Sequence, residues 1–158
     1  MFNSINLKKL ITSILIPLIV GILSAVITNG SMDVYGMIKT PPLAPPSILF
    51  PIVWTILFVL MGISLYIIRM QRCDEKTKKE AYFIFGAQLL FNFLWSIFFF
   101  VVQAYTFSAI WLVLMIVLII SMIVKFLKIN QIAGYIQIPY LIWCIFALYL
   151  NIAIAILN

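Results

Sequence analysis

The sequence predicts an all-α fold, an integral membrane bundle of five transmembrane helices in one domain spanning residues 1–158. Two observations predict it. Of the 158 residues, 66% are hydrophobic and 9% are charged, whereas about a quarter are charged in an ordinary soluble domain. A single soluble core of this size cannot bury so much apolar surface. The charges are also clustered, because uncharged runs of 23, 29, 44 and 30 residues follow Lys9, Lys39, Glu80 and Lys128.

Each long uncharged run predicts at least one membrane span. A helix needs about 20 apolar residues to cross the bilayer core, and helices satisfy their backbone groups in lipid. The third run would be about 66 Å long at 1.5 Å per residue, so it must fold back, and its best break is the segment 103–106. The predicted spans lie near 7–28, 47–70, 80–101, 106–127 and 131–156.

The ends of these spans carry local signals. The apolar run after Lys9 is longer than the 7–15 residues of a signal peptide core, so we expect a helix that is retained. Ser47 is positioned to cap the second helix, and Pro51 suits its first turns. The acids and bases of the segment 69–81 are expected to cap the helices on either side of it.

The basic residues predict the orientation. With the N-terminus inside, nine of the ten Lys and Arg residues lie inside and only Lys39 lies outside, as the positive-inside rule requires. We therefore expect a multi-pass protein of the cell membrane with its N-terminus inside and its C-terminus outside. The net charge of +6 is then a topology signal. It does not indicate nucleic-acid binding, because no soluble basic face interleaved with aromatic residues is present.

Neutral polar side chains share one face on each of two spans. Gln88, Asn92, Trp95 and Ser96 follow helical spacing in the third span, as do Tyr140, Trp143, Ala147 and Asn151 in the fifth. One interpretation is hydrogen bonding and close packing between helices. The other is an apolar, aromatic ligand pocket with a few hydrogen-bonding groups. No charged residue or His lies at the inner positions of a span, away from its ends, which argues against an ion-coupled carrier.

Metal binding and ordinary catalysis have no signal in the sequence. The chain has no His, and its two cysteines, Cys73 and Cys144, lie in a loop and in the fifth span, so neither a metal site nor a disulfide is indicated. No nucleophile–base pair or phosphate loop is visible. We expect no cofactor.

The tryptophans and the proline-rich segment suggest a covered pocket. Trp54, Trp95 and Trp143 lie deeper than an interfacial belt, where an indole N–H needs a protein or ligand partner, whereas Trp111 fits either position. The segment "KTPPLAPPSILFPIVW" (39–54) contains five prolines, which restrict the backbone to a stiff extended strap. This strap is either a brace for the bundle or a lid over a ligand.

Three motifs on three helices resemble one known family. "PPLAPPSILFPIVW", "QLLFNFLWSIFF" and "PYLIWCIFALYLN" are similar in order and spacing to the tryptophan-rich sensory protein and translocator protein family (TspO/MBR). The resemblance implies a five-helix membrane bundle, a homodimer and a pocket for porphyrins under the first loop. The Gly62 face also permits close helix packing.

The resemblance also implies roles for individual residues. Trp54 and Trp143 match two tryptophans implicated in porphyrin chemistry, and we expect them to face each other across a cavity roofed by residues 39–46. The ligand-binding residues expected on these combined grounds are Tyr35, Pro45, Trp54, Gln88, Asn92, Trp95, Tyr140, Trp143 and Ala147.

Three functions follow from the resemblance. The first is a receptor or sensor that binds porphyrins and similar flat hydrophobic ligands. The second is light-dependent oxidative degradation of porphyrin, in which Trp54 and Trp143 would be catalytic. The third is a carrier of hydrophobic small molecules. Binding is the preferred interpretation, because the sequence shows neither a conventional catalytic group nor a charged translocation path.

Overall fold

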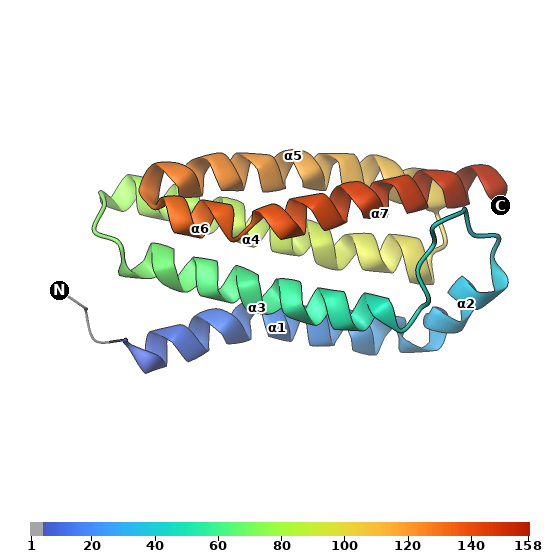
Figure 1. Ribbon diagram of the computed structural model, residues 1–158, viewed down its shortest axis with the longest axis horizontal. Coiled ribbons are helices and arrows are strands. Elements are labelled where there is room, and N and C mark those ends of the chain that lie inside the picture. The colour runs from blue at the N-terminus through green and yellow to red at the C-terminus, as the bar shows by residue number, and fades with distance from the viewer. Residues whose placement is uncertain (1–4) are drawn as a thin grey trace.

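The computed structural model describes residues 5–158 and consists of long helices that lie side by side (Figure 1). The first described residues and the C-terminus lie at opposite ends of this bundle. Within the described residues, five helical segments are long and apolar enough to cross a membrane, and no strand is present. The predicted fold class is therefore confirmed. The elements in order are α1 (Leu7–Thr28), η1 (Asn29–Ser31), α2 (Met32–Met37), α3 (Leu49–Met70), α4 (Glu75–Ser96), η2 (Ile97–Val101), α5 (Tyr105–Ile129), α6 (Gln131–Tyr135) and α7 (Ile138–Leu157).

The polar segment between α3 and α4 caps both helices, as the sequence predicts. Asp74 Oδ2 accepts a hydrogen bond of 2.8 Å from the backbone N–H of Thr77, and this bond holds the pKa of Asp74 below its usual value. Lys78 Nζ donates to the carbonyl oxygens of Arg69 and Gln71 at the end of α3. Because of the Asp74 cap, α4 begins at Glu75, five residues before the predicted start of the third span.

The N-terminus of α3 differs from the prediction. Its capping position is Ile48, and no side chain caps it, so the expected cap from Ser47 is wrong. Instead, two backbone hydrogen bonds form the turn that leads into the helix. The N–H groups of Leu49 and Phe50 donate to the carbonyl oxygens of Pro46 and Ser47, respectively. Pro51 lies in the first turn of the helix, as expected. Backbone N–H groups there have no acceptor within the helix, so the missing N–H of proline costs no hydrogen bond.

The long third run folds back at the predicted place. The α4 helix widens into the π-helical segment η2, and the chain then turns through residues 102–104. Gln103 takes a left-handed backbone conformation with φ of 58°, which is uncommon outside glycine. The fifth span is also interrupted, between α6 and α7 near Gln137, and Pro139 lies in the first turn of α7.

A close approach joins α1 to α3. A Cβ atom at Gly62 would overlap the Cα of Ile14 and lie 2.9 Å from the carbonyl oxygen of Ser13. Farther along the pair, Arg69 Nη1 donates to the hydroxyls of Thr12 and Ser13, both at 2.8 Å. The face that carries Gly62 is thus occupied by α1 and is not available for contact between two copies of the chain.

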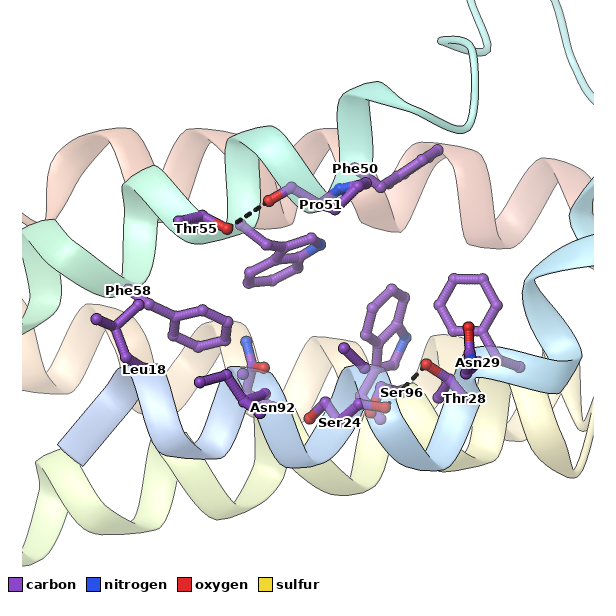
Figure 2. A pocket seen from close by; sticks show the side chains of 16 residues that line it. Leu18, Ser24, Thr28, Asn29, Phe50, Pro51, Thr55, Phe58, Asn92 and Ser96 are labelled. Carbon is purple, nitrogen blue, oxygen red and sulfur yellow. Dashed lines mark hydrogen bonds between the residues drawn. The ribbon is translucent and has the colours of Figure 1, made fainter. Parts of the chain in front are cut away.

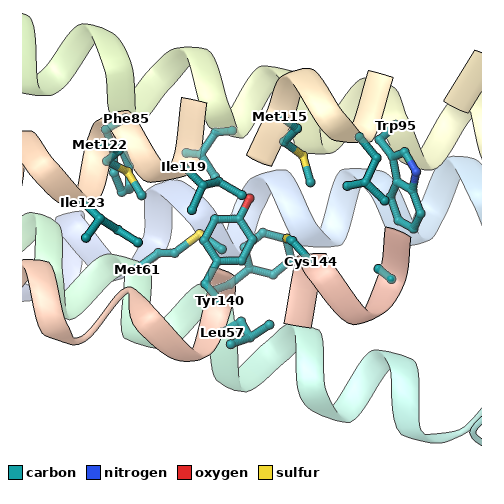
Figure 3. Close-up of a cluster of buried hydrophobic side chains, with 14 of the residues drawn as sticks. Leu57, Met61, Phe85, Trp95, Met115, Ile119, Met122, Ile123, Tyr140 and Cys144 are labelled. Atoms are coloured by element: carbon teal, nitrogen blue, oxygen red, sulfur yellow. The ribbon is translucent and has the colours of Figure 1, made fainter. Parts of the chain in front are cut away.

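The middle of the bundle is filled by large apolar side chains from α3, α4, α5 and α7 (Figure 3). Met61, Met115, Ile119 and Met122 have no exposed surface. Only Ser13, Pro17 and Thr28 are buried on α1. The core is therefore formed by the other four long helices, and α1 packs against the outside of this group.

The proline-rich loop (residues 39–46) is bound to the end of α7. Tyr149 donates its hydroxyl to the carbonyl of Pro42 at 2.9 Å, and the Asn158 side chain pairs with both backbone groups of Lys39 at 3.0 Å. Pro41 is buried. Leu43, in contrast, is exposed and has φ of 70°, a strained conformation for a branched side chain.

Candidate functional site

A cavity of about 380 Å³ lies between α1, α3, α4 and η2 (Figure 2). Its volume falls within the range of about 300–1,000 Å³ that is typical of small-molecule sites. None of the residues that line it is charged. They are Leu18, Gly21, Ile22, Ser24, Ala25, Thr28, Asn29, Phe50, Pro51, Trp54, Thr55, Phe58, Asn92, Trp95, Ser96 and Phe100.

Most hydroxyl groups in this wall are already bonded to their own helix. Thr28 donates to the carbonyl of Ser24 at 2.8 Å, and Thr55 donates to the carbonyl of Pro51 at 2.7 Å (Figure 2). The hydroxyl oxygen of Ser24 is buried and has no partner among the described residues. The cavity therefore presents an apolar surface with few free polar groups, which suits a hydrophobic ligand.

Trp54 forms the aromatic centre of the cavity wall. Its ring stacks on Phe58 with centroids 5.7 Å apart, and it lies 6.3 Å from the ring of Trp95 and 6.2 Å from that of Tyr140. Gly21 allows Phe58 to approach α1, since a Cβ there would lie 2.5 Å from the Phe58 ring. A flat ligand in this cavity would therefore meet aromatic rings on α3 and α4.

The two predicted polar faces meet behind this wall. Tyr140 is fully buried, donates its hydroxyl to Gln88 Oε1 at 2.7 Å and accepts a bond of 3.1 Å from Asn92 Nδ2. Gln88 and Tyr140 line neither cavity described here, so their geometry is that of interhelical hydrogen bonding. Asn92 does both, because it joins this network and also lines the large cavity.

Two of the indole N–H groups bond to neighbouring helices. Trp95 Nε1 donates to Asn151 Oδ1 at 3.0 Å, which connects α4 to α7. Trp111 Nε1 donates to the carbonyl of Phe91 at 3.0 Å, and the two rings stack 4.2 Å apart. Trp111 therefore joins α5 to α4 through both its ring and its N–H.

A second, small cavity of about 20 Å³ adjoins the first. It is lined by Tyr35, Phe50, Trp95, Phe99, Phe100, Ala147, Leu150, Asn151 and Ile154. Phe50, Trp95 and Phe100 line both cavities. These three rings, which we call the shared aromatic wall, stand where the two spaces meet.

The expected site residues are divided between these places. Trp54, Asn92 and Trp95 line the large cavity, and Tyr35 and Ala147, together with Trp95, line the small one. Pro45 and Trp143 line neither, and no residue of the proline-rich loop lines the large cavity.

The expected face-to-face arrangement of Trp54 and Trp143 is therefore not found. Trp143 packs edge-on against Phe50, with ring centroids 6.1 Å apart, and also lies against Phe146. Phe50, rather than Trp143, presents its ring to the cavity.

Sequence reasoning missed the contribution of α1, which supplies six of the lining residues. A signal was present, because Gly21, Ser24, Ala25 and Thr28 recur at helical spacing on one face. Small side chains on one face of a membrane helix leave room for a partner or a ligand. Within residues 5–158, no group of three or more His, Cys, Asp or Glu side chains comes together.

Comparisons with known proteins agree with the resemblance in the motifs. The model of the TspO/MBR family matches residues 13–157. The chain is 35% identical to the tryptophan-rich protein TspO of Archaeoglobus fulgidus over 97% of this chain and 99% of the relative. It is 34% identical to the protein of the same name from Chlorobaculum tepidum over 78% of each chain. It is also 31% identical to the tryptophan-rich sensory protein of Cereibacter sphaeroides, over 74% of this chain and 72% of the relative.

Proposed function

This chain belongs to the TspO/MBR family of multi-pass membrane proteins, and on that basis we propose that it is a membrane sensor for a porphyrin or similar flat hydrophobic molecule. The ligand occupies the large cavity between α1, α3 and α4 and stacks on Trp54. A sensory role is carried over from the name of the Cereibacter sphaeroides relative.

The observation that carries this proposal is the uncharged aromatic lining of the large cavity. Trp54 and Phe58 on α3 and Trp95 on α4 contribute rings to this lining, and stacking on such rings is worth about 0.5–1.5 kcal/mol per pair beyond the area buried. Asn92 adds a polar side chain to the same lining. A flat conjugated molecule is the ligand class that makes most use of these groups.

Light-dependent porphyrin degradation is the second candidate, and the position of Trp54 favours it. An indole that lines the cavity would touch a bound macrocycle and donate an electron to its light-excited state, with dioxygen as the oxidant that accepts the electrons removed from the ring. Transport has less support, because no charged residue lines the cavity. The sensor and the enzyme differ in one measurable respect, which is whether the bound porphyrin is chemically altered.

Tryptophan-fluorescence titration of the purified protein with protoporphyrin IX, in the dark and in light, tests the proposal. We expect saturable quenching, and Trp54→Phe should weaken binding about three- to tenfold because the stacking partner is reduced. Trp111→Phe is the matched control, since Trp111 bonds to Phe91 and lines neither cavity. Equal effects of the two substitutions would place the ligand elsewhere.

Two further measurements separate the candidates. With no His in the chain, iron lacks its usual axial ligand, so metal-free porphyrin should bind at least as well as haem. A sensor leaves the porphyrin absorption spectrum unchanged in light beyond a protein-free control. Faster loss of porphyrin with the wild type, abolished in Trp54→Phe and Trp143→Phe while binding falls only modestly, would establish the degradation function instead.

A further inference from the structure

Arg69 lies near the end of α3 and uses one nitrogen of its guanidinium to hold α1. Nη1 donates to the hydroxyls of Thr12 and Ser13, both at 2.8 Å, and to the carbonyl oxygen of Lys9 at 3.2 Å. Nε and Nη2 have no hydrogen-bond partner among the described residues. The side chain is half-buried, so the bonds to α1 fix a guanidinium whose other edge is free.

The fixed guanidinium has no carboxylate beside it. Among the residues that the structure describes, Glu75 and Glu80 are ion-paired with lysines of α4 and α5. Asp74 caps α4, and Asp33 belongs to α2 at the other end of the bundle (Figure 1). Arginine binds carboxylates and phosphates through two parallel N–H groups. Arg69 therefore has the free edge that such an oxyanion needs, and the chain supplies no anion to it.

More cations without an ionic partner lie near Arg69. Lys8 and Lys9 are in the first turn of α1, and the carbonyl of Lys9 is one that Arg69 reaches. Arg72 follows in the loop after α3. These three side chains are exposed, and none forms an ion pair within residues 5–158. We call Lys8, Lys9, Arg69 and Arg72 the basic corner, since together they attract an anion more strongly than one guanidinium does.

Exposed apolar side chains run from the basic corner along α1. Ile11, Leu15 and Ile19 are exposed and follow Lys8 at i+3, i+7 and i+11, so they lie on the same face of the helix. In a bilayer this face contacts acyl chains, and the charges at its end lie at the depth of the lipid headgroups. The oxyanion most abundant at that depth is a lipid phosphate, whose own chains cover the apolar face.

We propose that the basic corner binds the headgroup of an anionic phospholipid. The phosphate accepts two hydrogen bonds from Nε and Nη2 of Arg69, and the other three cations favour a lipid of net negative charge over a zwitterionic one. Because Arg69 also holds α1, the lipid binds to α1 and α3 as one unit. This site is separate from the large cavity, which no charged residue lines.

Binding of radiolabelled dioleoyl phosphatidylglycerol to the full chain in neutral detergent micelles, measured by scintillation proximity, tests the proposal. Dioleoyl phosphatidylcholine is the matched zwitterionic probe. We expect Arg69→Gln to weaken phosphatidylglycerol binding about fivefold or more, the factor for one basic residue at an anionic surface, and to change phosphatidylcholine binding less than about twofold. Lys9→Gln should show the same selectivity with α1 in place, because Arg69 bonds to the backbone carbonyl of Lys9.

Lys128→Gln is the matched control, because it removes one exposed charge at the end of α5, a helix that packs against α4, α6 and α7. It should change phosphatidylglycerol binding less than about twofold. Equal losses in Arg69→Gln and Lys128→Gln would show diffuse attraction and overturn the site. Equal affinity of the wild type for the two lipids would overturn it as well.

Two further outcomes are decisive. If Arg69→Gln weakens the binding of both lipids because α1 is displaced, Lys9→Gln decides, and unchanged phosphatidylglycerol affinity in that variant overturns the proposal. Inorganic phosphate, exchanged for chloride at constant ionic strength, should leave the bound lipid in place. Displacement of the lipid by millimolar phosphate would show that the basic corner takes the free anion, which also overturns the proposal.

Discussion

Replacement of Gly62 by alanine should separate α1 from the rest of the bundle. The Cβ of an alanine would overlap the backbone of Ile14 and crowd the carbonyl oxygen of Ser13 at 2.9 Å. Backbone atoms cannot rotate away as a side chain does, so the two helices must move apart. Such overpacking costs about 1–3 kcal/mol.

The opposing effect is helix propensity, since Gly→Ala in a helix interior gains up to about 1 kcal/mol. Gly86→Ala isolates that gain, because Gly86 is an exposed position on α4 where a Cβ would meet no described heavy atom within 4 Å. We therefore expect the free energy of unfolding of Gly62→Ala to lie about 1–3 kcal/mol below that of Gly86→Ala.

The assay is equilibrium unfolding in mixed micelles with increasing sodium dodecyl sulfate, followed by circular dichroism and tryptophan fluorescence. A second readout is porphyrin affinity, which should fall in Gly62→Ala alone because α1 forms one wall of the large cavity. Equal stability of the two variants would refute the close approach of α1 and α3. Unequal stability with equal porphyrin affinity would refute the role of α1 in the site.

Three other predictions concern the polar network, the orientation and the assembly. Tyr140→Phe leaves the Asn92 N–H and the Gln88 carbonyl without the phenol, so the free energy of unfolding should fall by about 1–2 kcal/mol in the same assay; an unchanged value would show that the network contributes nothing. Cys73 should resist a membrane-impermeant thiol reagent on intact cells and react after lysis, and labelling before lysis would reverse the orientation. The protein should have the mass of a homodimer by light scattering in mild detergents, and a monomer mass in all of them would contradict this.

The long helices were predictable because their signal is coarse. Charges are excluded from lipid, so the spacing between Lys9, Lys39, Glu80 and Lys128 locates the spans within a few residues. Their ends were less predictable, because a cap depends on local backbone geometry. Asp74 caps α4, whereas Ser47, with an equally suitable side chain, does not cap α3.

Irregular backbone was not visible in the hydropathy pattern. The irregular features are the short helix α2, the π-helical segment η2 and the interruption between α6 and α7. Their residues suit an ordinary helix equally well. Their geometry follows from packing in three dimensions, which periodicity does not record. Pro139 in the first turn of α7 is the one local signal among them.

The candidate site was predictable by helix face and not by side-chain direction. The faces of Asn92 and Tyr140 do meet, as their spacing indicates. Trp143 shares the Tyr140 helix, yet its ring packs against Phe50 and lines neither cavity. A helical spacing defines a face about 100° wide, and a long side chain within it can point to either edge.

For the ligand proposed above, the uncharged lining of the large cavity determines which ligand concentration governs binding. Without a charge, the site exerts no long-range attraction through water, and a hydrophobic ligand is already dissolved mainly in the surrounding lipid. The bilayer is then both the reservoir of the ligand and the competitor for it. An apparent dissociation constant will therefore rise in proportion to the amount of lipid or detergent present, and affinities are comparable only as mole fractions within the membrane.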